Sequence, residues 1–142
     1  EDRSFDFNYD ALQTGRRTVS NMNADGVLQD RSAKLFRGTI DFQKGAAGSK
    51  GDEKEDVLLL GEDVVNRTIP LILCAEEDVE GNHGASIGQL DEDILFYMNS
   101  RGLSRAEAEL LITHSKLEAL CAKANDPGLT DRVHRYLEEN AQ

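Results

Sequence analysis

The fold class of this chain is decided by the stretch Phe36-Arg37-Gly38-Thr39-Ile40-Asp41-Phe42. Apolar side chains and glycine alternate there with polar ones, and this period of two is typical of a β-strand with one buried face. Residues 57–60 form a short apolar run, and residues 67–75 place apolar side chains on both faces of a further strand. Pro70 in that last segment cannot donate a ladder hydrogen bond, which indicates a sheet edge or a bend.

The first ninety or so residues are therefore expected to be mainly β. Short strands separated by turns predict a β-sandwich, a β-barrel or a β-solenoid. The chain has no exact internal repeat, so periodicity leaves these three folds open. Residues 45–51, which are glycine, alanine, serine and one lysine, predict a flexible loop between two of the strands.

A helical part begins near residue 90. Asp91 is a candidate N-cap for a helix that ends at Gly102. Ser104 and Glu107 have the spacing of a capping box that opens a longer helix. Asp126, followed by proline, predicts the start of a last helix. The sequence thus predicts two domains, a β portion over residues 1–90 and a helical segment over residues 91–142.

Composition excludes some classes of function. The net charge of −11 argues against a nucleic-acid-binding protein, because the phosphates of nucleic acid need a basic surface. No apolar run reaches the length of a membrane span, and residues 1–15 lack the pattern of a signal peptide, so the cytoplasm is the expected location. Acidic clusters at 52–56, 76–78 and 91–93 are interpreted as solvated surface, with an acidic metal site as the alternative, although none has EF-hand spacing.

The cysteines offer no metal motif. Cys74 and Cys121 lie far apart with no CxxC, and each is expected to be a small buried hydrophobe rather than a ligand. His83 is the sharper candidate, because it lies between Gly81 and Gly84 and is predicted to occupy a turn between the last strand and the first helix. Its imidazole could bind iron or carry a proton, and the alternative is an exposed loop histidine.

One long tract resembles a known family. It comprises His-Gly-Ala-Ser-Ile-Gly-Gln-Leu-Asp-Glu-Asp from residue 83, Leu-Phe-Tyr from residue 95, and Ser-Arg-Gly-Leu-Ser from residue 100 with Glu-Ala following. This tract resembles the SufB/SufD family of iron–sulfur cluster assembly scaffold proteins, and the glycine and alanine after His83 resemble SufD more than SufB. The resemblance implies a right-handed parallel β-helix, present as its last rungs, plus a C-terminal helical segment.

The resemblance also implies a function. The chain would be a non-catalytic component, from the C-terminal portion of such a protein, of a SufB–SufC–SufD type scaffold that carries a transient iron–sulfur cluster. His83 would be the candidate cluster-assembly and metal residue, and no cofactor would be tightly bound to this chain. The implied partners are a SufC-like ATPase and a SufB-like or identical subunit that pairs through the β-helix. Contact with the ATPase would involve Phe96, Tyr97, Arg101 and Gly102.

Two positions depart from the family pattern. Gly81 stands where many SufD chains carry a cysteine, so the thiolate ligand is missing, and Lys116 stands where an aromatic residue is usual. The alternative function is a stand-alone β-solenoid module for protein interaction, without a metal role.

Overall fold

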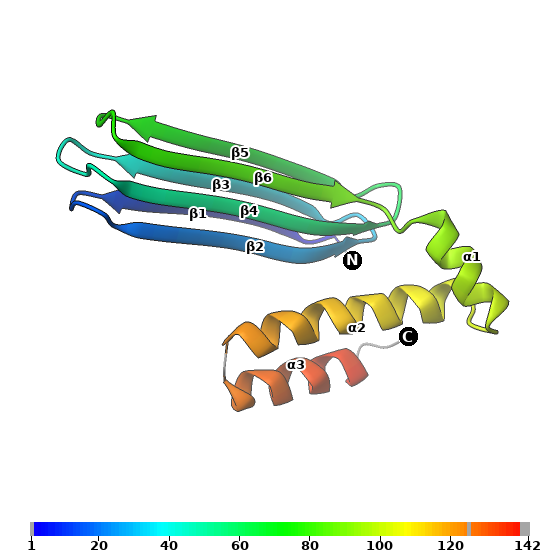
Figure 1. Cartoon of the computed structure of the whole chain (residues 1–142). Helices are drawn as coiled ribbons and strands as arrows, with labels where there is room; N and C mark the ends of the chain where they lie inside the picture. The colour runs from blue at the N-terminus through cyan, green and yellow to red at the C-terminus, as the bar shows by residue number, and fades with distance from the viewer. Residues whose placement is uncertain (1, 125, 140–142) are drawn as a thin grey trace. The chain divides into compact units, whose positions relative to one another are not determined.

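A computed structural model describes residues 2–124 and 126–139 of the chain. The chain divides into two compact units, and the boundary lies between Gly88 and Gln89. Among the described residues, the first unit consists of six β-strands and the second of three α-helices (Figure 1).

The six strands alternate between two parallel sheets. Strands β1, β3 and β5 form one sheet in that order, and β2, β4 and β6 form the other, so that Figure 1 shows two layers. Each strand is thus hydrogen-bonded to the strand two places further along the chain, a winding that is consistent with a β-helix-like fold. The bounds are β1 (Ser4–Gln13), β2 (Val19–Gln29), β3 (Ala33–Phe42), β4 (Ser49–Leu60), β5 (Val65–Cys74) and β6 (Val79–Gly88).

One buried apolar cluster of this unit lies between the two sheets at one end of the strands, and Leu28, Phe36 and Val57 are buried outside it. Ile40 and Phe42 of β3 are fully buried in this cluster with Ala46 of the following turn. Partly buried apolar side chains from β2, β5 and the start of β6 pack against them. This confirms the strand predicted from the alternation at residues 36–42, and the even-numbered residues of that strand are the buried ones.

Several strands begin earlier or run longer than the sequence indicated. The predicted loop at 45–51 ends at Gly48, because β4 starts at Ser49 and continues through the acidic cluster. Strand β4 pairs with β2 on one side and β6 on the other, so ladder hydrogen bonds hold its acidic first part, which lies ahead of the apolar run at residues 57–60. Pro70 lies in β5, which is a sheet edge among the described strands, as predicted. Cys74 is exposed, contrary to expectation, whereas Cys121 is buried.

The second unit contains α1 (Glu92–Ser100), α2 (Arg105–Ala124) and α3 (Pro127–Glu139). Their first residues follow from the predicted caps. The Asp91 carboxylate accepts a hydrogen bond from the Asp93 N–H at 2.8 Å. Ser104 and Glu107 form the reciprocal capping box, and Asp126 accepts bonds from two N–H groups at the start of α3. None of the described helices is both long and apolar enough to cross a membrane.

Candidate functional site

His83 lies in the middle of strand β6, so the prediction of a turn was wrong. Its register partner on β4 is Glu53, and the partner of Glu53 on β2 is Met22. Paired residues of parallel strands point to the same face of a sheet, and Met22 packs against the core. The imidazole of His83 therefore lies on the face that looks toward the other sheet.

The carboxylate beside His83 is buried. The Glu53 side chain has no exposed surface, and His83 is 27% exposed. Within residues 2–124 and 126–139, neither oxygen of Glu53 has a hydrogen-bond partner. The Nδ1 atom of His83 is 3.6 Å from Glu53 Oε1, which is an ion-pair distance but too long for a hydrogen bond.

Across the interior, Gly38 of β3 makes room for this carboxylate. A Cβ atom at position 38 would lie 2.4 Å from Glu53 Oε2, which is closer than two such atoms can approach. The glycine in the strand is thus explained by the close approach of the carboxylate rather than by backbone conformation.

Burial determines the electrostatics of the site. Loss of water around the Glu53 carboxylate raises the pKa of this group above its ordinary value of 4.5. The positive charge that His83 can carry acts in the opposite direction, and the neighbouring Glu55 adds to the rise. Because burial is the largest of these causes, the charged form of Glu53 is disfavoured in the folded chain.

A second buried carboxylate lies next to this one and is satisfied. Glu55 of β4 forms an ion pair with Lys34 of β3 and accepts a hydrogen bond from the Thr68 hydroxyl of β5. The acidic cluster at 52–56 was expected to be solvated surface, and this is wrong for Glu53 and Glu55. The odd-numbered side chains of this strand point to the interior because side chains alternate between the two faces. The charge pattern alone does not predict which face of the strand is buried.

The described residues place no third possible metal ligand beside His83 and Glu53. No group of three or more His, Cys, Asp or Glu side chains that could hold a metal ion occurs in the described part of the chain. Gly81 also points inward, and a Cβ there would lie 2.9 Å from Ile72 and 3.2 Å from Phe42. Apolar side chains thus fill the space next to this position and leave little room for the cysteine that the resemblance leads us to expect there.

The predicted partner-binding residues belong to the second unit. Phe96 and Tyr97 of α1 are 75% and 58% exposed. The guanidinium of Arg101 lies 5.1 Å from the centre of the Tyr97 ring, at cation–π distance. Gly102 follows with a φ of +93°, the left-handed conformation that ends the helix. All four residues are thus exposed at or just after α1, and Tyr97 and Arg101 are in contact with each other.

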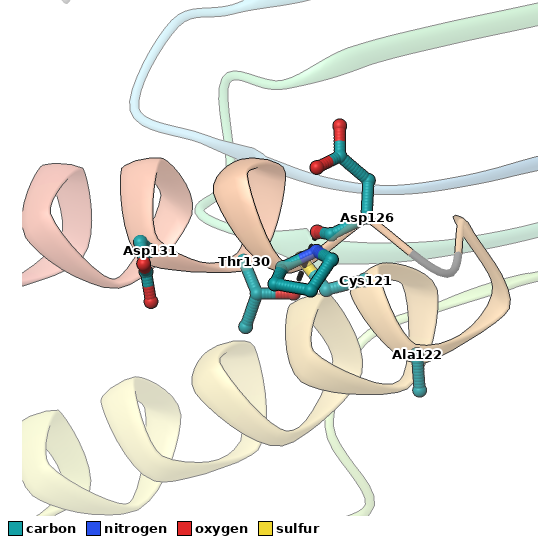
Figure 2. A pocket seen from close by; sticks show the side chains of 6 residues that line it. Cys121, Ala122, Asp126, Thr130 and Asp131 are labelled. Atoms are coloured by element: carbon teal, nitrogen blue, oxygen red, sulfur yellow. Dashed lines mark hydrogen bonds between the residues drawn. The ribbon is translucent and has the colours of Figure 1, made fainter.

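The second unit also has a shallow hollow where α2 meets α3. Figure 2 shows it with the side chains of Cys121, Ala122, Asp126, Pro127, Thr130 and Asp131. The Asp126 carboxylate there already caps α3, and the Thr130 hydroxyl donates to the Asp126 carbonyl. The hollow contains none of the residues predicted to form a site.

Comparison with known proteins gives one family. The family model described as "SUF system FeS cluster assembly, SufBD core domain" matches residues 1–116. The iron–sulfur cluster assembly protein SufD of Bacillus subtilis is 28% identical over 136 residues, which cover 96% of this chain and 31% of that protein. SufD of Escherichia coli is 28% identical over 107 residues, covering 75% of this chain and 25% of its own length.

A third relative is an iron–sulfur cluster assembly SufBD family protein of Mycobacterium bovis. It is 33% identical over 122 residues, which are 84% of this chain and 14% of that protein. The chain therefore spans less than a third of the length of each of these three relatives.

Proposed function

Because this chain belongs to the SufB/SufD family, as a C-terminal portion of such a protein, we propose that it acts in iron–sulfur cluster assembly. Its role is that of a non-catalytic, SufD-like component of a SufB–SufC–SufD type scaffold. The winding of the six strands supports a right-handed parallel β-helix for its first unit.

The observation that carries the proposal is the position of His83. The imidazole stands on an edge strand next to a buried carboxylate, and it remains 27% exposed. An imidazole that is fixed by a strand but still reachable from solvent can bind iron as a neutral donor. His83 thus contributes a ligand to a cluster that is assembled transiently, while no cluster stays tightly bound to this chain.

The partner subunit pairs with the last strands. Among the described strands, β5 and β6 each have a neighbour on one side, so their outer edges present backbone N–H and C=O groups to another chain. A SufB-like subunit or a second copy of this chain adds its own edge there. Self-association of the chain in light scattering at tens of micromolar supports this pairing, and a monomer at that concentration contradicts it.

A SufC-like ATPase binds the surface at α1 formed by Phe96, Tyr97, Arg101 and Gly102. Phe96 is the best single probe, because most of its side chain is exposed and we expect its removal to leave the fold intact. We expect Phe96→Ala to weaken capture of the ATPase by the full-length protein. Leu111→Ala is the matched control, since it also removes an exposed apolar side chain but from α2.

Anaerobic reconstitution with iron and sulfide tests the function itself. The full-length protein is loaded together with its ATPase and partner subunit, and cluster content is read from the visible absorption. We expect His83→Ala to lower the cluster content, while His134→Ala, which removes a half-buried histidine of α3 that pairs with Glu118, leaves it unchanged. Equal cluster content in the parent protein, His83→Ala and His134→Ala would instead favour an interaction module without a metal role.

A further inference from the structure

We propose that Glu53 and His83 together form a binding site for one ferrous ion, held between β4 and β6 as cargo for cluster assembly. This inference rests on the proposed function, and it adds to His83 a second ligand that lies thirty or so positions away in the sequence. The register of the two strands brings the residues together.

The first argument is the state of the carboxylate. A buried carboxylate normally has hydrogen bonds or a close ion pair, because an unsatisfied one is costly. Glu53 has no hydrogen bond to either oxygen within the described residues, although its side chain is completely buried. Its neighbour Glu55 is equally buried but fully engaged by Lys34 and Thr68. Of the two, only Glu53 has both oxygens available for a cation.

The second argument is the distance between the two donor atoms. Zinc, a divalent ion that takes the same two donors, binds imidazole nitrogen and carboxylate oxygen at about 2.1 Å, and a tetrahedral angle at such an ion places the two donors about 3.4 Å apart. The observed separation of His83 Nδ1 and Glu53 Oε1 is 3.6 Å. The two atoms therefore stand at the spacing of two ligands of one ion, while they are too far apart to satisfy each other by a hydrogen bond.

The third argument is access. His83 lies on an edge strand of the described sheet and is partly exposed, so an ion can reach Nδ1 from that side. On the inner side, the missing Cβ of Gly38 leaves the space that the carboxylate occupies. The pair thus lies at the boundary between solvent and the interior.

The donor set indicates the class of ion. One imidazole and one carboxylate suit a divalent transition metal such as Fe²⁺, and no third ligand stands nearby in the part of the chain that the structure describes. The remaining coordination positions are left to water, to sulfide or to a ligand from another chain. A site with two protein ligands binds weakly and releases its ion readily, as cargo transfer requires.

The test is anaerobic titration of this chain with Fe²⁺ alone, followed by calorimetry. We expect Glu53→Gln and His83→Ala each to weaken binding at least ten-fold. Glu80→Gln is the matched control, because Glu80 lies on the same strand as His83, is exposed and pairs with Lys50. Gly38→Ala is a second variant that leaves both ligands in the sequence but pushes the carboxylate away, and it should weaken binding as well.

The outcomes separate the two proposals. Loss of binding in both ligand variants, with the control unchanged, supports the site. If His83→Ala loses Fe²⁺ binding while Glu53→Gln binds Fe²⁺ as the parent does, the role of Glu53 is overturned. The proposed function of His83 is then unaffected. Unchanged binding in His83→Ala overturns the pair whatever Glu53→Gln does. Circular dichroism of each variant verifies that it is folded.

Discussion

Replacement of Glu53 by glutamine should make the metal-free protein more stable at neutral pH. The substitution keeps the shape of the side chain and removes a charge that is buried without a hydrogen bond. Most substitutions at fully buried positions destabilise a protein, so a gain here is a specific consequence of the unsatisfied carboxylate. Such a gain also fits a residue kept for binding rather than for stability.

The size and the pH range follow from linkage. The folded-state pKa of Glu53 is raised above 4.5, so the folded chain binds this proton more tightly than the unfolded chain does. Its contribution to the free energy of unfolding therefore decreases, by up to about 1.4 kcal/mol per pH unit, as the pH rises from 4.5 through the folded-state pKa. Glutamine is itself a polar group without a hydrogen-bond partner there, so Glu53→Gln recovers only the part of the cost that is due to the charge. We expect this gain to be on the order of 1 kcal/mol at neutral pH, because each unit by which burial raises the pKa corresponds to about 1.4 kcal/mol.

Urea unfolding followed by far-UV circular dichroism measures the effect, with a chelator present to remove metal. The curves of the parent chain and of Glu53→Gln should differ at neutral pH and converge below pH 4.5, where the carboxyl group is protonated in both states. Glu80→Gln, an exposed charge on β6, should change the free energy of unfolding by no more than about 0.5 kcal/mol. A variant no more stable than the parent at neutral pH, or a difference independent of pH, would refute the reasoning.

Three further substitutions test other parts of the same interior. Lys34→Met leaves Glu55 buried without its cation, so we expect the free energy of unfolding in urea to fall by about 3–5 kcal/mol. A decrease below about 1 kcal/mol would mean that the pair is not buried in solution. Gly81→Cys adds the thiol that the family resemblance leads us to expect at this position, and it should cost about 1–3 kcal/mol because Ile72 must move. Unchanged thermal unfolding would contradict the packing described at this position. His83→Ala should cost up to about 1 kcal/mol at neutral pH, since it removes the ion-pair contact of a partly exposed imidazole with Glu53, and a loss well above this value would contradict the geometry described.

The predictions that held from sequence were those set by local chemistry. The alternation at 36–42 predicts a strand because side chains of a strand point to opposite faces, and the structure buries Phe36, Ile40 and Phe42. Capping works in the same local way. Asp91 and the Ser104–Glu107 pair satisfy N–H groups within a few residues of themselves, so the first residues of α1 and α2 follow from the sequence.

The surroundings of Glu53 and His83 were decided by the tertiary structure. From sequence alone, a run of acidic residues predicts a solvent-exposed segment. Here the run is part of strand β4, and alternate side chains of a strand point to the interior whatever their charge. The turn predicted at His83 failed for a related reason, since the strand there is held by ladder hydrogen bonds to β4 and not by an apolar pattern of its own. Glu53 and His83 are distant in sequence, and only the register of β4 with β6 places one beside the other, because parallel strands pair residues that no local pattern connects.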